Sequence, residues 1–275
     1  MNRTIAKNNP AFPSTGTWTP EQLKLAFYLY CQTPFGRLHS RNPEIVELAG
    51  LIGRTPNALA MKRSNFASLD PLITATGRHG LKGVSALDRE IWNEFHSDWD
   101  GLAAECARLH KSLLSENYPY SGSEPEDELD DDLPLADFTG EMREAVVQKR
   151  IKQDFFRRAV LASYRGRCCI SGVSENCLLV ASHIIPWSKD KSNRLNPRNG
   201  LCLSAIHDKA FDKYLFSLSE DYRVVLSKQM KISKDAFLRT VFWTIEGKRI
   251  EMPERFAPAG EFVAKHRQTM LSQES

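Results

Sequence analysis

The chain has 275 residues, of which 41% are hydrophobic and 26% are charged, and its formal net charge is +3. This length favours two modest domains over one. No stretch approaches the roughly 20 apolar residues that a membrane span needs, and the first nine residues lack the apolar core of a signal peptide. Six cysteines without a disulfide framework favour a reducing compartment, so we expect a cytoplasmic protein with no membrane contact.

The charge is unevenly distributed along the chain. Residues 1–120 carry a net charge of +2, residues 121–142 carry −9, and residues 143–275 carry +10. A basic C-terminal half is what a polyanionic substrate requires, although a basic surface can also serve ordinary solubility. The acidic stretch 118–141 is predicted to be a disordered linker. An alternative is that it mimics DNA and shields the basic half.

Residues 17–117 are predicted to form a helical domain. Three helices begin with a capping residue followed by proline, at Thr19-Pro20, Asn42-Pro43 and Thr55-Pro56. Gly53 separates the second from the third, with the spacing of a helix-turn-helix unit; the alternative is a plain helical interaction module. On the first interpretation, four side chains on the recognition helix or at its entry face DNA: Arg54, Asn57, Lys62 and Arg63.

The most informative stretch runs from residue 180 to residue 212. Val180 to Ile185 is predicted to be a strand, and Leu201 to Leu203 a returning strand before a short helix from Ala205 to Phe211. A hairpin packed on a helix would bring together three side chains that are distant in sequence: His183, Asn199 and His207.

Those three side chains suit metal-assisted hydrolysis of a phosphodiester. A neutral imidazole can take a proton from water near neutral pH. A divalent ion can bind the scissile phosphate and stabilise charge on the leaving oxygen. An amide side chain can fix the orientation of the base or complete the metal shell.

The stretch resembles the HNH endonuclease family, in the branch written Ser-His-Ile-x-Pro-Trp, then Asn-Gly-Leu, then His-Asp-x-x-Phe-Asp. The resemblance covers roughly residues 160–230. It implies a ββα-metal fold with His183 as the general base and His207 at the metal, and it suggests a restriction or phage-defence role. The matching residues are Ser182, His183, Ile184, Pro186, Trp187, Asn199, Gly200, Leu201, His207, Asp208, Phe211 and Asp212.

The chain departs from the family pattern at two places. Ser182 stands where many of these enzymes carry a metal-binding Asp or His. We expect Asp212 to supply the missing carboxylate, because the Asp208 side chain should point about 100° round the helix from His207. Ser171, three residues after Cys168, replaces the second cysteine of a zinc knuckle, so no structural zinc is expected.

Beyond the motif, two hairpins and a closing helix are predicted. The hairpins pair Tyr214 to Leu218 with Tyr222 to Leu226, and Arg239 to Ile245 with Lys248 to Met252. The helix runs from Pro258 to Met270. Three basic residues near the site are candidate phosphate contacts: Arg194, Arg198 and Lys209.

The sequence therefore predicts an α+β protein that is a metal-dependent DNA endonuclease, with a recognition domain at 17–117, a linker at 118–141 and an HNH nuclease domain at 142–275. The expected cofactor is a divalent ion, Mg²⁺ or Mn²⁺ before Ni²⁺ or Zn²⁺, with no small-molecule cofactor. The expected partner is double-stranded DNA, and a homodimer would suit cleavage of both strands. Two alternatives stay open: a catalytically weak DNA-binding regulator, and an RNA-directed nuclease.

Overall fold

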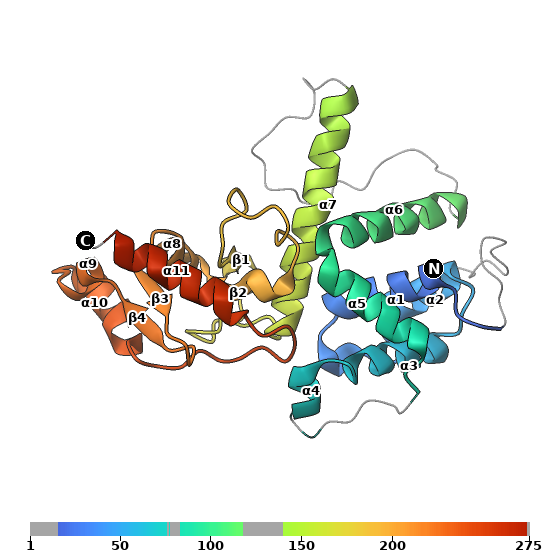
Figure 1. The fold of residues 1–275 in the computed structure, drawn as a ribbon, viewed down its shortest axis with the longest axis horizontal. Helices are drawn as coiled ribbons and strands as arrows, with labels where there is room; N and C mark the ends of the chain where they lie inside the picture. Colours follow the sequence, from blue (N-terminus) through green and yellow to red (C-terminus); the bar gives the residue numbers. More distant parts are fainter. Residues whose placement is uncertain (1–15, 76, 78–82, 118–139, 274–275) are drawn as a thin grey trace.

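The computed structural model of the chain describes residues 16–75, 77, 83–117 and 140–273. Figure 1 shows two lobes: a helical lobe formed by the N-terminal half, and a C-terminal lobe that combines helices with short strands. The α+β class expected from the sequence is confirmed. The predicted acidic linker lies almost entirely outside the described residues. No helix among the described residues has both the length and the apolar character that a bilayer crossing requires.

The helical lobe begins where the sequence signals predicted. Thr19 caps the first helix in a capping box with Gln22, and Asn42 and Thr55 cap the next two, each followed by proline at the first helical position. The lobe consists of α1 (Pro20–Gln32), a 3₁₀ turn (Phe35–Arg37), α2 (Pro43–Leu51), α3 (Pro56–Ala67), α4 (Pro71–Ala75), α5 (Ala86–Ser97) and α6 (Trp99–Asn117).

Helix α1 forms the centre of this lobe. Phe27 is fully buried, and its ring contacts those of Phe66, Phe95 and Trp99. The polar side chain of Gln22 is buried as well, and it donates to the carbonyl oxygen of Ile52 at 2.8 Å. These contacts tie α1 to its neighbours on several sides, so the lobe has one continuous core.

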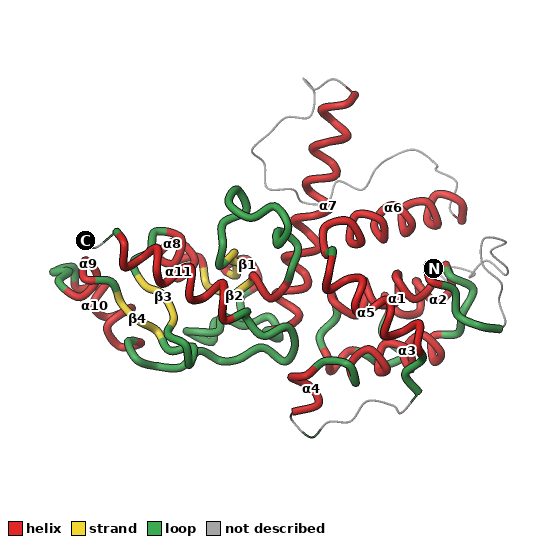
Figure 2. The backbone as a smooth tube through the Cα atoms, viewed as in Figure 1, coloured by secondary structure: helices red, strands yellow, loops and turns green. Residues whose placement is uncertain are grey.

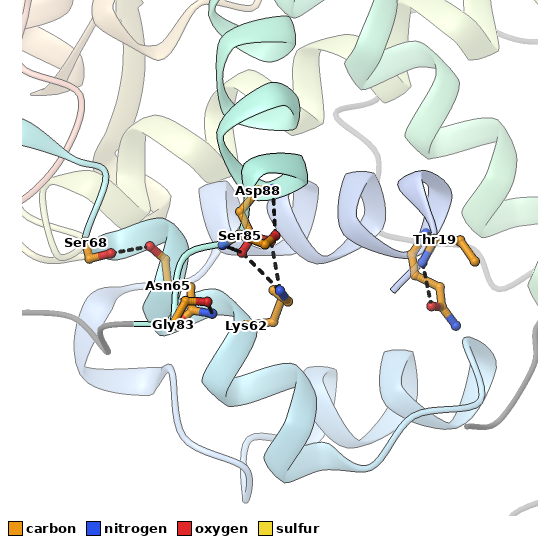
Figure 3. Close-up of polar contacts among 8 residues, drawn as sticks. Thr19, Lys62, Asn65, Ser68, Gly83, Ser85 and Asp88 are labelled. Carbon is orange, nitrogen blue, oxygen red and sulfur yellow. Dashed lines mark hydrogen bonds and ion pairs between the residues drawn. The ribbon is translucent and has the colours of Figure 1, made fainter. Parts of the chain in front are cut away.

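The predicted recognition helix is not a free surface helix. Gly53 takes the left-handed conformation (φ 67°) between α2 and α3, as a helix-turn-helix would require. However, Lys62 is only 8% exposed and its ammonium lies 2.9 Å from Asp88, while Arg63 is fully buried and donates to Leu29 O at 3.1 Å. Figure 3 shows Lys62 reaching the start of α5, where Asp88 also bonds the backbone of Ser85. The expectation that Lys62 and Arg63 project towards DNA is therefore wrong.

The C-terminal lobe is built on two antiparallel two-stranded sheets and the helices around them (Figure 2). In the first sheet, Leu179 pairs with Ser204 and His183 with Gly200; in the second, Phe216 pairs with Leu226. The elements are α7 (Gly140–Ser163), a 3₁₀ turn (Asn176–Leu178), β1 (Leu179–His183), a 3₁₀ turn (Pro197–Asn199), β2 (Gly200–Ser204), α8 (Ala205–Asp212), β3 (Phe216–Leu218), β4 (Val224–Leu226), α9 (Lys228–Lys231), α10 (Ala236–Phe242), a 3₁₀ turn (Trp243–Ile245) and α11 (Gly260–Ser272).

One predicted hairpin is wrong. The stretch from Arg239 to Ile245 is helical, because Asp235 caps α10 by accepting from the Leu238 amide at 2.8 Å. Phe242 and Ile245 are both buried and three residues apart, which is a helical spacing. The hairpin of β3 with β4 and the closing helix α11 are confirmed.

Helix α7 packs against both lobes. The Phe155 ring stacks on Tyr28 of α1 at 4.9 Å, whereas the next ring, Phe156, stacks on His183 of β1 at 3.8 Å. Near its middle, Lys152 pairs with Asp100 of α6 at 2.6 Å. Because consecutive residues point to different lobes, α7 links the helical lobe directly to the end of β1.

A buried arginine provides a second link between the lobes. Arg255, from the segment before α11, is fully buried and donates to the carbonyl oxygens of Tyr30 and Thr33, the latter at 2.7 Å. These carbonyls lie at the C-terminal end of α1, where orphan acceptors and the helix dipole favour a cation. The C-terminal lobe thus supplies part of the cap of the central helix of the other lobe.

Candidate active site

The β1–β2 hairpin lies between α7 and α8. Gly200, opposite His183 in the register, is the point of closest approach: a Cβ there would lie 2.4 Å from Val160 Cγ2 and 3.0 Å from Phe156 Cζ. Only glycine allows α7 to come this close. The glycine of the Asn199-Gly200 pair is therefore required for packing against α7, and β2 begins at this residue.

His183 ends β1 with its ring held on several sides. The ring is stacked on Phe156 at an interplanar angle of 10°, and Trp187 meets it edge-on at 5.5 Å. Its Nε2 lies 2.9 Å from the carbonyl oxygen of Arg194. A carbonyl can only accept, so Nε2 carries the proton and Nδ1 keeps its lone pair. Burial lowers the pKa of His183, and the Arg194 bond offsets this in part, so the ring is neutral at neutral pH.

Asn199 closes the loop that follows His183. Its side chain is fully buried: Oδ1 accepts from the Ile185 amide at 2.8 Å, and Nδ2 donates to the carbonyls of Ile185 and Asn193, both at 3.1 Å. Its backbone oxygen also accepts from Ile184 at 2.9 Å. Every polar atom of the amide is used in this way. The geometry fits a residue that braces the loop, not a residue that binds a metal.

His207 lies inside the C-terminal lobe. It is 4% exposed, its Nδ1 is 2.7 Å from Ser204 Oγ and 3.7 Å from Cys168 Sγ, and Phe242 meets the ring edge-on. Nε2 is buried without a hydrogen-bond partner among the described residues. Burial by itself raises the pKa of the Cys168 thiol, but hydrogen bonds from His207 and Ser171 lower it to about 6.

The carboxylates of α8 form a pair on another face of the helix. Asp208 and Asp212 are four residues apart, so they are neighbours one turn apart. Burial raises the pKa of Asp208, and nearby Ser182 of β1 offsets the rise in part. Burial also raises the pKa of Asp212, and the charge of Asp208 adds to that effect. Asp208 therefore faces β1, and Asp212 lies one turn further along α8 at an exposed position.

The geometry of α8 bears on the predicted metal set of His207 and Asp212. Residues five apart are separated by about 140° round a helix, so His207 and Asp212 cannot share a face of α8. The structure places Asp208, not His207, beside Asp212 and Ser182. The spacing of the two aspartates was visible in the sequence. The direction in which the helix faces β1 was not, since it depends on His207 being buried.

The carboxylate pair fits part of a metal shell. Within the described parts of the chain, no group of three or more His, Cys, Asp or Glu side chains could hold an ion. Mg²⁺, however, is commonly bound through one or two carboxylates, with water and substrate phosphate completing its shell. A divalent cation would also relieve the repulsion between Asp208 and Asp212. These two residues are the donors that the site offers.

The remaining predicted DNA contacts differ in their exposure. Arg54 is bound to Gln22 Oε1 at 2.9 Å and lies over the Trp18 ring, so its side chain has a structural role. Arg194 donates to Trp187 O at 2.8 Å and lies over that indole. The positions that the structure leaves exposed are Asn57, Arg198 and Lys209.

Comparison with known proteins supports the interpretation of this segment. A family model described as HNH endonuclease matches residues 168–219, which span the turn before β1, the hairpin, its loop, α8 and β3. No curated protein matches the chain. The match covers a minor part of the sequence and supports placing that part in the HNH family, with nuclease chemistry at the general level and nucleic acid as the implied substrate.

Proposed function

We propose that the protein is a metal-dependent endonuclease that hydrolyses phosphodiester bonds in double-stranded DNA. The observation that carries the proposal is the state of His183, whose Nε2 proton is held by the Arg194 carbonyl so that Nδ1 is free to accept a proton. A neutral, oriented imidazole is what a general base for water activation requires. It lies in the segment that matches the HNH endonuclease model.

In the proposed reaction, His183 Nδ1 removes a proton from water as the water oxygen bonds to phosphorus. The bond from phosphorus to the leaving oxygen breaks, and that oxygen takes a proton from solvent. The Arg194 carbonyl stabilises the imidazolium that forms, because it already accepts from Nε2. Asn199 keeps the loop closed, so the Arg194 carbonyl and the His183 ring keep their relative positions.

Asp208 and Asp212 are the residues that would hold the divalent ion. When bound, such an ion supplies charge stabilisation at the scissile phosphate. The exposed cations Arg198 and Lys209 suit contacts with the phosphate backbone, as does the net charge of +10 on residues 143–275. Mg²⁺ or Mn²⁺ suits the oxygen ligands best.

The same proposal assigns a role to each of the three parts of the chain. Residues 17–117 would serve DNA recognition, the acidic stretch 118–141 would connect the two parts, and 142–275 would carry out cleavage in a cytoplasmic restriction or phage-defence system. Because Lys62 and Arg63 are buried, recognition would use other surfaces of the helical lobe, with exposed Asn57 as a candidate contact.

The test is the ion and substrate requirement of the whole chain. Supercoiled plasmid and a structured RNA are each incubated with the protein in EDTA, in Mg²⁺ and in Mn²⁺. We expect nicked or linear plasmid only with a divalent ion, and little change in the RNA. DNA binding with no cleavage under any ion would indicate a regulator instead, and preferential loss of the RNA would indicate an RNA-directed enzyme.

A further inference from the structure

A group of apolar and basic side chains is exposed along residues 228–243, which include the short helices α9 and α10. Ile232 is 77% exposed, Phe237 is 61% exposed and Trp243 is 37% exposed, all within twelve residues of sequence. We call this surface the α9–α10 patch and define it by Ile232, Phe237 and Trp243 with three exposed lysines, Lys228, Lys231 and Lys234. Scattered exposed apolar residues are ordinary, but a cluster of large ones indicates an interaction surface.

The local structure explains why these side chains remain outside. Ser227 caps α9 and Asp235 caps α10, so each short helix has a fixed direction. Met230 and Phe242 turn inward and are buried, which leaves Phe237, five residues before Phe242, on the opposite side of α10. The exposure of Phe237 is therefore a consequence of how α10 is anchored.

The segment of the chain that carries the patch is rich in basic residues. Residues 222–249 contain seven basic and two acidic residues, and all nine are exposed. Both acidic side chains are already engaged: Glu246 pairs with Lys231 at 2.7 Å, and Asp235 caps α10. The guanidinium of Arg239 lies 4.3 Å from the centre of the Trp243 ring, which holds the indole at the surface. Such a surface is complementary to a polyanion.

We propose that the α9–α10 patch binds the DNA duplex on which His183 acts, away from the scissile phosphate. Lysines would contact backbone phosphates, while Phe237 and Ile232 would contact bases or sugar faces in a groove, as apolar side chains do in proteins that bend DNA. The inference rests on the proposed nuclease function and specifies a second substrate contact for it.

The position of the patch supports this occupant. Phe242 of α10 meets His207 of α8 with ring centroids 5.5 Å apart, so α10 contacts α8 on the side of His207, while Asp208 and Asp212 lie on another face of that helix. Figure 1 places α9 and α10 at the end of the C-terminal lobe that is farthest from the helical lobe. A duplex bound at the patch would therefore not meet the helical lobe.

The experiment measures DNA binding separately from cleavage. All variants are made in a full-length His183→Ala background, and affinity for labelled duplexes of about three helical turns and about one turn is followed by fluorescence anisotropy over a range of salt concentrations. The test variants are Lys228→Glu/Lys234→Glu and Phe237→Ala. The matched controls change exposed residues of the C-terminal lobe outside the patch: Arg167→Glu/Lys265→Glu for charge and Leu271→Ala for apolar truncation.

We expect the lysine variant to bind the long duplex more weakly, with the slope of log affinity against log salt reduced by roughly 2. Phe237→Ala should weaken binding roughly tenfold without changing that slope. Both losses should be smaller on the short duplex, and the controls should stay within about twofold. Thermal melting by circular dichroism should be unchanged, since the altered side chains are exposed.

Three results would overturn the inference. In the first, the patch variants bind both duplexes with the same affinity as the His183→Ala protein. Phe237→Ala could convert a dimer to a monomer in analytical ultracentrifugation, which would assign the patch to a second copy. Binding through the patch to phosphatidylserine vesicles, with none to DNA, would assign it to a lipid surface. A failure of the proposed nuclease function can be told apart from these results. In that case the protein with His183 intact would bind DNA through the patch but would not cleave it.

Discussion

The two lobes use their polar side chains in opposite ways. In the helical lobe, Lys62 and Arg63 lie in the interior and bond to Asp88 and to the end of α1. In the C-terminal lobe, the His183 ring packs at the end of β1 against α7 with Nδ1 keeping its lone pair, and Asp208 and Asp212 lie one turn apart on α8. A basic residue on a predicted recognition helix is therefore weaker evidence for DNA contact than a histidine within a recognisable sequence motif is for an active site.

Arg63 illustrates why the helical lobe can retain buried cations. Burial and the nearby charge of Arg255 lower the pKa of Arg63 to about 9, which still leaves it charged at neutral pH. Its acceptor, Leu29 O, lies in the last turn of α1. Carbonyl groups there lack helical partners, and the helix dipole gives that end a partial negative charge. The arginine stabilises the helix end, and this contact keeps it away from solvent.

The largest expected effect tests the structural role of Lys62. Lys62→Met leaves Asp88, which is 0% exposed, without its cation, and removal of one partner of a buried pair costs about 3–5 kcal/mol of unfolding free energy. Urea denaturation measures the loss. The exposed neighbour Arg89→Met should change stability by less than about 0.5 kcal/mol. Unaltered stability combined with weaker DNA binding would restore the recognition-helix interpretation.

The next effect concerns His266, a buried histidine of the C-terminal lobe. It donates from Nε2 to Phe211 O and accepts at Nδ1 from Ser217, and burial lowers its pKa from 6.5 to about 4. The folded state therefore binds fewer protons than the unfolded chain between these values. Stability should be complete above pH 6.5 and should fall by about 3 kcal/mol as the pH drops to 4.

Comparison with His266→Gln isolates this contribution from that of other groups. The variant should be less stable at pH 7, and its stability should fall less steeply between pH 6.5 and 4. Parallel stability curves for the two proteins would show that His266 does not carry this dependence.

A third prediction separates Asp208 from His207 as the metal residue. Asp208→Asn should lower the Mg²⁺-dependent cleavage rate by at least about 100-fold, because the ion loses a charged ligand. The melting temperature should not fall, since burial already disfavours the charge of Asp208. Asp221→Asn, the same change on the exposed β3–β4 turn, should retain the wild-type rate. Equal rates for both variants would remove Asp208 from the site.

The smallest predicted effect concerns the approach of α7. Gly200→Ala places a methyl group against Val160 and Phe156, and overpacking of this kind costs about 1–3 kcal/mol. Because His183 stacks on Phe156, cleavage should slow as well. Gly260→Ala is the control, since a Cβ at Gly260 meets nothing within 4 Å. If the two alanine variants behave alike, the contact at Gly200 is not tight.

The sequence predicted the parts of the fold that depend on local signals. The caps at Thr19, Asn42 and Thr55, the hairpin ending at His183 and the helix after Ser204 all formed as expected. Each depends on residues within a few positions of one another, such as a side-chain oxygen and the amide it caps.

The features that the sequence did not predict depend on packing between distant segments. Whether Lys62 faces solvent was decided by Asp88, 26 residues away, and the cap that Arg255 provides for α1 spans more than 220 residues. The orientation of α8 follows from the burial of His207 against Cys168, 39 residues earlier. Periodicity places such residues on a face of a helix, but it does not tell which element covers that face.

The role of His183 as general base is tested by plasmid cleavage in the presence of Mn²⁺. The wild-type chain is compared with His183→Ala, and His39→Ala is the exposed-histidine control. The His183→Ala rate should fall by roughly 10²–10⁴, while His39→Ala should cleave as the wild type does. Cleavage by His183→Ala at the wild-type rate would contradict the assignment of His183 as the general base, and with it the proposed active site.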